Sequence, residues 1–310
     1  MSSPAPIVMG LLFGTFCVAG LIVNIIVIMA IIRGKLLYSR SSPVYILSLQ
    51  SLFPDIIMLL MHLSYLAPSV IAQDWLFPGG MHGSGTELLS SIFMYCWYNT
   101  SLSHILVALN RLQVVVFYWT PSLSRGQVMT AAICVHCLSL FLAVFSQYIS
   151  PCCKLSYHFV YYSYVYDDSS KVFNYSNMFV DLPLNSTSTI TAIICYSSIV
   201  IAMHRMRVKT GGADIVSRKR QTEYKFAMQF CVMAAWYSCS WLSFRIFPPL
   251  IGDSKSLWLF GLTTIFVIFN ASSNAVIYLV NNTDIKRAIY SMVGSLKVGS
   301  IVIPSTGRSK

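Results

Sequence analysis

The stretch IVMGLLFGTFCVAGLIVNIIVIMAII, residues 7–32, decides the fold class of this chain. Its 26 residues carry no charge. At about 1.5 Å per helical residue, such a helix exceeds the roughly 30 Å hydrocarbon core of a bilayer. The stretch is also too long for the apolar core of a signal peptide, and no basic residue precedes it. We therefore expect a transmembrane helix that is retained in the protein.

Six more apolar blocks follow, at residues 43–72, 88–117, 127–149, 185–207, 226–250 and 257–281. The 310 residues are 56% hydrophobic and only 10% charged, with a mean hydropathy of +0.67, which leaves too little polar surface for a water-soluble protein. A helix satisfies its own backbone hydrogen bonds in lipid, whereas an open strand does not. The pattern predicts an all-α membrane protein, with a seven-helix domain over residues 1–292 and a tail over residues 293–310.

The basic residues fix the orientation of this bundle. Seventeen of the 21 Lys and Arg residues fall in the first, third and fifth connections, at the adjoining helix ends, or after the last block. The positive-inside rule makes these segments cytoplasmic and places the N-terminus outside. The net charge of +11 follows from this topology and indicates no nucleic-acid partner.

Two N-glycosylation sequons lie on the outer side. One begins at Asn174 in the long connection between the fourth and fifth blocks, and the other begins at Asn185, where that connection meets the fifth block. Both asparagines are predicted glycosylation sites.

Several polar residues lie where lipid excludes them, and the sharpest is Asp55 in the second block. A charged side chain in a span costs roughly 2.5–3.5 kcal/mol on insertion scales, so it is a functional hypothesis by default. Asn24, Thr100, Asn270 and Asn274 come from three other blocks. They form with Asp55 either a hydrated cluster that holds a cation or a static polar contact between helices.

Other polar residues give weaker signals. His62, His104 and His136 have no second ligand at i+4, so we expect interhelical hydrogen bonds and no metal site. The nine cysteines lack zinc-site spacing, and no cofactor is indicated. Arg245 at the outer end of the sixth block either snorkels outward or faces an acidic group of a ligand.

Short motifs, read in order, resemble those of rhodopsin-like G-protein-coupled receptors. They include Asn24 in the first span, Asp55 in the second, Leu109-Asn110-Arg111 at the end of the third, and Asn274-Ala275-Val276-Ile277-Tyr278 in the seventh. The segment from Thr283 to Tyr290 then reads as a short amphipathic helix on the inner leaflet. Together with Pro151-Cys152-Cys153 before a tyrosine-rich outer loop, these motifs look like those of nematode serpentine receptors of class V, X or T.

The chain also departs from the rhodopsin-like pattern. No cysteine stands near the outer end of the third span, so the usual disulfide to the second outer loop lacks its partner unless Cys96 is shallow. Asn110 replaces the acidic residue before Arg111, and Ala275 replaces the proline after Asn274. These changes are typical of divergent chemoreceptors.

The resemblance implies a chemosensory receptor in the plasma membrane, in a sensory cilium if the nematode likeness holds. It binds an external small molecule and signals through a heterotrimeric G protein. The implied residues fall into three sets: a ligand pocket of Tyr95, Trp97, Tyr98, Trp241 and Arg245; a G-protein-facing set of Arg111, Asn110, Arg218, Lys219 and Arg220; and a switch motif of Asn274 and Tyr278. The tyrosine-rich segment 157–166 forms either a lid over the pocket or an interfacial aromatic belt.

Three other classes of function compete with the receptor. A small-solute transporter is disfavoured because the two halves of the chain show no matching repeats. An enzyme is disfavoured because Asp55 is the only carboxylate within a span. A membrane protein that binds without signalling stays open, because the motifs at Asn110 and Ala275 are altered.

Overall fold

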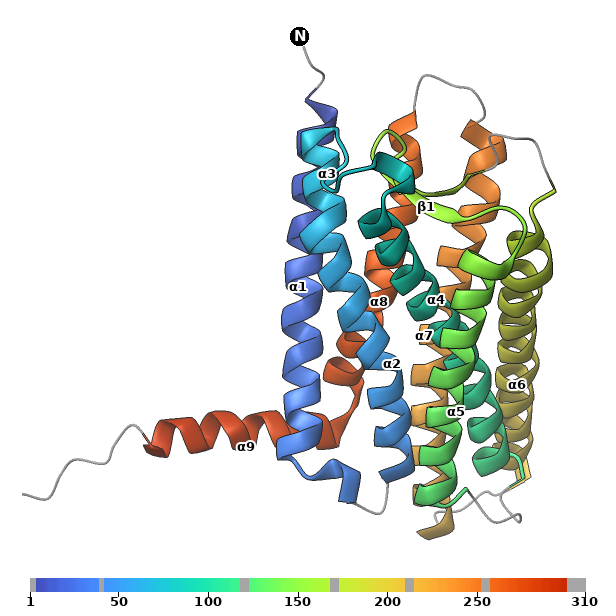
Figure 1. Cartoon of the computed structure of the whole chain (residues 1–310). Coiled ribbons are helices and arrows are strands. Elements are labelled where there is room, and N and C mark those ends of the chain that lie inside the picture. The colour runs from blue at the N-terminus through green and yellow to red at the C-terminus, as the bar shows by residue number, and fades with distance from the viewer. Residues whose placement is uncertain are drawn as a thin grey trace, which may run out of the picture.

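The computed structural model describes residues 4–38, 42–117, 123–167, 173–209, 215–251 and 257–299. Long helices lie side by side in an antiparallel bundle, and α9 extends sideways from one end (Figure 1). The helices are α1 Ala5–Arg33, α2 Ser42–Met61, α3 Ala67–Ala72, α4 Ser84–Val115, α5 Arg125–Val144, α6 Leu182–Lys209, α7 Ile215–Ile251, α8 Gly261–Asn281 and α9 Thr283–Gly299.

Short turns of π-helix continue three of these helices. They are η2 His62–Leu66, which joins α2 to α3, η4 Phe145–Ile149 after α5, and η5 Asn177–Asp181 before α6. Short 3₁₀ turns form η1 Leu36–Tyr38, η3 Gly80–His82 and η6 Leu257–Phe260. With α2, η2 and α3 counted as one span, the described residues form the seven expected spans.

Five of the described helices are long and apolar enough by themselves to cross a membrane: Ala5–Arg33, Pro43–Ala72, Arg125–Ile149, Asn177–Arg205 and Gly261–Asn281. The other two spans, α4 and α7, are long but less apolar. α4 contacts α2, α5, α6 and α7, so its polar residues face other helices and not lipid. α7 begins at Ile215, eleven residues before its expected start, because its basic first turns extend beyond the apolar part.

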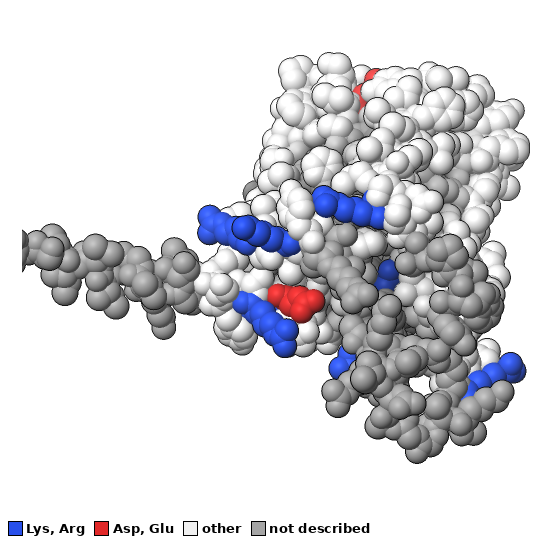
Figure 2. All heavy atoms as spheres, turned by 90° about the horizontal axis from the view of Figure 1, so that it is seen from below, with Lys and Arg blue, Asp and Glu red and all other residues white. Residues whose placement is uncertain are grey.

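The two ends of the bundle differ. The N-terminus and an antiparallel hairpin of β1 (Leu155–His158) and β2 (Ser163–Tyr166) lie at one end, which we call the outer end. α9 lies at the other, inner end (Figure 1). Seen from the inner end, the described Lys and Arg side chains gather with little acidic surface between them (Figure 2). This distribution agrees with a cytoplasmic inner end.

The expected amphipathic helix after the seventh span is present as α9. Asn282 caps it, because its side-chain Oδ1 accepts the backbone N–H groups of Asp284 and Ile285 at 3.0 and 3.1 Å. Tyr45 of α2 donates its hydroxyl hydrogen to Asp284 Oδ2 at 2.9 Å, which fixes the start of α9 against the bundle. The helix runs to Gly299, past the expected start of the tail at 293, and residues 300–310 lie outside the described residues.

Alanine substitutions at two glycines of α1 are expected to change the stability of the protein in opposite directions. A Cβ atom at Gly10 would overlap Ile71 Cγ1 and lie 2.8 Å from the Ala67 carbonyl oxygen, whereas one at Gly14 meets only Leu63 Cδ1 at 3.9 Å. Gly10→Ala is expected to lower the free energy of unfolding by about 1–3 kcal/mol through overpacking. Gly14→Ala, the matched control, is expected to raise it slightly through helix propensity. The apparent melting temperatures of the two variants, measured in the same detergent, check whether one falls and the other rises. Equal shifts in the two variants would contradict the close packing at Gly10.

Candidate functional site

A cavity of about 780 Å³ opens inside the outer end of the bundle. Its wall combines α4, the β1–β2 hairpin, η5, the outer part of α7, and the η6–α8 junction. The lining combines Phe, Tyr and Trp rings with an equal number of polar or charged side chains. This size and composition are typical of sites for small organic ligands.

The hairpin closes the cavity from the outer side. The ring of Tyr164 stacks on Phe93 of α4 with centroids 3.7 Å apart, and Tyr164 is buried. The hairpin is tied to α8 by two hydrogen bonds, one from Thr264 Oγ1 to the carbonyl of Tyr162 at 2.8 Å and one between the Ser163 and Thr263 hydroxyls at 2.6 Å. Because its central tyrosines pack inside the bundle, this geometry favours the lid over the interfacial belt.

The structure brings three of the five expected pocket residues to the cavity: Trp97, Trp241 and Arg245. Tyr95 faces α5 instead, where its hydroxyl lies 2.7 Å from His136 Nδ1. Tyr98 is fully buried and does not line the cavity. Both are on the same helix as Trp97, and its rotation separates them from the site.

Sequence reasoning missed an acidic residue in the cavity wall. Asp181, expected in an outer loop, ends η5, and its Oδ2 accepts a hydrogen bond from Arg245 Nη2 at 2.7 Å. Arg245 therefore neither snorkels to the surface nor stands alone. The available signal was an isolated acid four residues before the fifth apolar block.

The two sequons differ in their surroundings. Asn185 is fully buried, and its Nδ2 donates to the backbone and side-chain oxygens of Asp181, both at 2.7 Å. The nitrogen that would carry a glycan has no room for one, which argues against glycosylation at Asn185. Asn174 is partly exposed three residues before η5, where its Oδ1 accepts the backbone N–H of Asn177 at 2.9 Å. Glycosylation of Asn174 stays a prediction.

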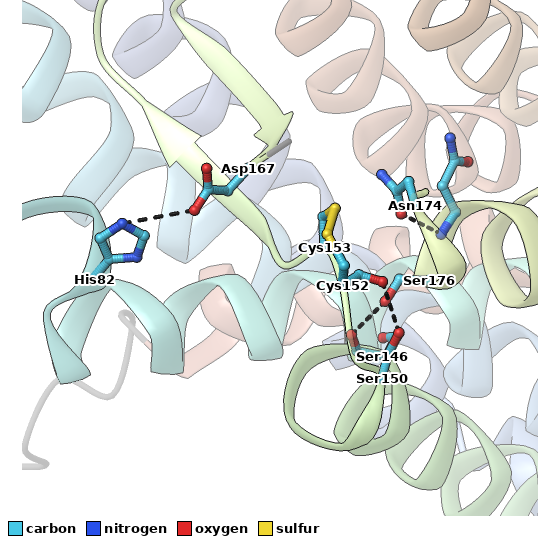
Figure 3. The surroundings of a disulfide bond; sticks show 9 residues. His82, Ser146, Ser150, Cys152, Cys153, Asp167, Asn174 and Ser176 are labelled. Carbon is cyan, nitrogen blue, oxygen red and sulfur yellow. Dashed lines mark hydrogen bonds and ion pairs between the residues drawn. A yellow bond between two sulfur atoms is a disulfide. The ribbon is translucent and has the colours of Figure 1, made fainter. Parts of the chain in front are cut away.

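The outer-loop cysteines bond to each other and not to α4. Cys152 and Cys153 form a disulfide beside the hairpin, and Cys96 is a buried free thiol (Figure 3). The Cys152 carbonyl accepts hydrogen bonds from Ser150 Oγ at 2.9 Å and from the Ser176 backbone N–H at 3.2 Å. These contacts hold the start of the loop between η4 and η5.

The polar residues expected around Asp55 are only partly brought together. Asp55 is buried, and its Oδ2 accepts a hydrogen bond from Asn274 Nδ2 at 2.6 Å, which links α2 to α8. Asn24 bonds instead to the backbone carbonyls of Gly20 and Ala271, at 2.9 and 3.1 Å, and Thr100 bonds to its own helix. Asn270 is buried, and its Oδ1 has no hydrogen-bond partner among the described residues.

The three expected interhelical histidines also differ. His136 Nδ1 lies within hydrogen-bond distance of Tyr95 and Asn99, as expected. His62 Nδ1 instead lies 2.7 Å from the Met58 carbonyl of its own helix, and His104 packs against the ring of Tyr237 at 4.8 Å. Within the described ranges, no group of three or more His, Cys, Asp or Glu side chains could hold a metal ion.

At the inner end, Arg111 is covered by neighbouring helices. Its side chain is 1% exposed, it donates a hydrogen bond from Nη2 to Asn110 Oδ1, and its Cζ lies 5.8 Å from the ring centre of Phe230 on α7. Tyr278 of α8 packs against that ring in turn. The backbone of α7 includes Arg218, Lys219 and Arg220, but their side chains lie outside the described part of the structure.

Comparison with known proteins relates this chain to a receptor family and to receptor structures. A family model described as "Serpentine type 7TM GPCR chemoreceptor Srx" matches residues 15–282. The crystal structure of squid rhodopsin superposes with a TM-score of 0.75 at 16% sequence identity, covering 98% of this chain and 90% of that one. No curated protein matches. At this identity the rhodopsin likeness shows the fold alone.

Proposed function

Because the chain belongs to the Srx family of serpentine seven-transmembrane chemoreceptors, we propose that it detects an external small molecule in the cavity under the β1–β2 hairpin. The protein is a G-protein-coupled chemosensory receptor with the fold of rhodopsin. The expected resemblance to serpentine receptors is confirmed, and class X is the class that matches. The cavity is the observation that carries the proposed binding site.

α7 connects the proposed ligand site to the proposed G-protein site. Trp241 and Arg245 line the cavity at its outer end, and Phe230 covers Arg111 near its inner end. Phe230 and Arg245 are about four turns apart, or roughly 22 Å at about 1.5 Å per residue. A ligand that binds better to a state with α7 displaced would uncover Arg111 and shift the population toward that state.

The inner face is the proposed partner surface. Arg111, Asn110 and the basic start of α7 would meet the G protein, and Asn274 and Tyr278 would rearrange between the states. Asp55 with its partner Asn274 is the proposed centre for a hydrated cation, since its carboxylate is the only one on α2 and α8 within the described residues. We place the receptor in the plasma membrane, in a sensory cilium of a chemosensory cell.

A signalling assay tests the proposed site. Cells that express the receptor with promiscuous G proteins are screened for calcium and second-messenger responses to pooled odorants and secreted small molecules. We expect an active pool whose response loses at least about tenfold in potency with Trp241→Ala, because stacking and burial on this ring are removed. The matched control is Trp236→Ala, one turn and a half earlier on α7, which is 37% exposed and does not line the cavity. Equal loss in both variants would contradict the cavity as the ligand site.

A further inference from the structure

The ion pair in the cavity wall is unevenly accessible. The Arg245 side chain is 26% exposed and the Asp181 side chain 11% exposed, although both line the cavity. Arg245 Nη2 donates a hydrogen bond to Asp181 Oδ2 at 2.7 Å. A ligand in the cavity therefore meets more of the cation than of the anion.

Asp181 and Arg245 also differ in how many of their hydrogen-bonding groups are already used by the protein. Both oxygens of Asp181 are engaged, since Oδ1 accepts from Asn185 Nδ2 at 2.7 Å while Oδ2 accepts from Arg245. Tyr237 in turn donates its hydroxyl hydrogen to Asn185 Oδ1, which fixes that amide. Each oxygen of Asp181 therefore already accepts a hydrogen bond from the protein, and this carboxylate is the more buried partner of the pair.

Arg245 has N–H donors that form no hydrogen bond within the described part of the chain. A guanidinium carries five N–H donors, and within the described part of the chain Arg245 uses one of them in a hydrogen bond. Its Nε lacks an acceptor there, as does Nε1 of Trp241, one turn away on α7 and also in the cavity wall. These two nitrogens are buried, whereas the guanidinium as a whole is partly exposed, so its remaining N–H donors are available to an acceptor in the cavity.

We infer that the cavity selects a small organic acid, whose carboxylate is received by Arg245 and whose apolar body packs against the aromatic wall. A carboxylate offers two oxygens in the geometry that a guanidinium fork binds bidentately. This inference rests on the proposed function, because it takes the cavity to be the ligand site.

Of the other ionisable groups of the cavity wall, His158 fits an acid, whereas Asp167 is a second carboxylate. His158 lines the wall, and burial lowers its pKa below the ordinary value, so it is neutral at neutral pH. Its Nδ1 accepts the backbone N–H of Val160 at 3.3 Å, which leaves the hydrogen on Nε2 as a further donor. Asp167 lies at the hairpin's edge, where its Oδ2 is 3.7 Å from His82 Nε2 (Figure 3). An amine deeper in the cavity would meet an engaged Asp181 beside a repelling Arg245.

The aromatic side chains of the cavity wall indicate that the ligand also has an apolar part. Trp97 meets Phe244 edge to face, with ring centres 5.6 Å apart, and Phe93 of α4 stacks on Tyr164 of the hairpin. These rings contribute apolar surface that buries an aryl or alkyl group. The ligand class is therefore an amphiphilic acid, with one anionic end and an apolar body.

Binding to the purified full-length receptor in lipid nanodiscs tests this inference. The probes are arylalkyl and alkyl carboxylates of increasing size, beginning with 3-phenylpropionate, each paired with its amide and with the amine of matched length. Competition titration and the shift in apparent melting temperature are measured. We expect at least one acid to bind about tenfold to hundredfold tighter than its amide and amine, the range that one charge-assisted hydrogen bond supplies.

Variants of the ion pair make the test specific. Arg245→Gln combined with Asp181→Asn removes both charges yet keeps a hydrogen-bonding pair, so the fold is preserved and acid and amide are expected to bind within about twofold of each other. Asp181→Asn alone removes the competing carboxylate and should strengthen acid binding. Arg125→Gln, at an exposed cation of the inner end, is the matched control and should leave the preference unchanged.

Several results would overturn the inference: no acid binding tighter than its amide, preference for an amine, or full acid preference in the double variant. Failure of the proposed function would look different. Acid binding without any G-protein response leaves this inference standing and removes the signalling role. A response to neutral or cationic ligands without acid binding would leave the signalling role standing and overturn the inference of an acidic ligand.

Discussion

Arg111→Ala is expected to abolish ligand-evoked G-protein activation while the protein still reaches the cell surface and binds its ligand. Arg111 is 1% exposed beneath Phe230, and it is the cation that a displaced α7 would present to a partner. Its truncation removes that contact without touching the outer cavity, which lies at the other end of α4. Second-messenger output, surface labelling and ligand binding, measured on the same cells, check the three parts of this expectation.

The matched control for this variant is Arg125→Ala. Arg125 also lies at the inner end, but it is exposed and its Cζ lies 4.9 Å from the ring centre of Tyr38, away from α7. We expect a change of less than about twofold in potency, because exposed charges contribute little. Full signalling by Arg111→Ala would end the role proposed for Arg111. Loss of signalling in both variants would point to the overall basic charge of the inner face.

Asn274→Ala is expected to destabilise the receptor by about 1–3 kcal/mol, because it removes the hydrogen bond that Asn274 gives to the buried carboxyl of Asp55. The contact joins α2 to α8, so its loss also loosens the proposed switch. Thermal unfolding in nanodiscs measures the effect. Ser273→Ala is the control, since the Ser273 hydroxyl donates only to the carbonyl of Asn270 on its own helix, at 2.9 Å.

A double-mutant cycle isolates this contact. If Asn274 acts through Asp55, then Asn274→Ala costs much less when Asp55→Asn is already present, with a coupling free energy of about 0.5–3 kcal/mol. Additive losses would show that Asn274 stabilises the bundle through another neighbour. The cycle therefore separates the interhelical link from a general effect of polar residues in α8.

The helices and their order were predictable because membrane spans are encoded locally. An uninterrupted apolar stretch such as residues 7–32 has no other stable state in lipid than a helix, whatever surrounds it. The amphipathic start of α9 was readable for the same reason, since its apolar face follows the period of one helix. The order of Asn24, Asp55, Arg111 and Asn274 along these spans indicated the receptor family that the family model shows.

The composition of the site was less predictable, because it depends on how each helix is rotated and packed. The pairing of Arg245 with Asp181 joins residues 64 positions apart, and apolar patterning contains nothing about which faces of η5 and α7 meet. Tyr95, Trp97 and Tyr98 look equivalent in sequence, yet only Trp97 lines the cavity.

By itself, the sequence determined that this protein is a bundle of seven membrane-spanning helices, its orientation and its family, because hydrophobic length, charge placement and motif order are properties of the chain read in one dimension. Only the tertiary structure decided that the loop hairpin closes a cavity and that Asp181 occupies one side of Arg245. It also decided that Asn185 is buried. The physical reason is that these features are contacts between distant segments, and side-chain packing in three dimensions selects them.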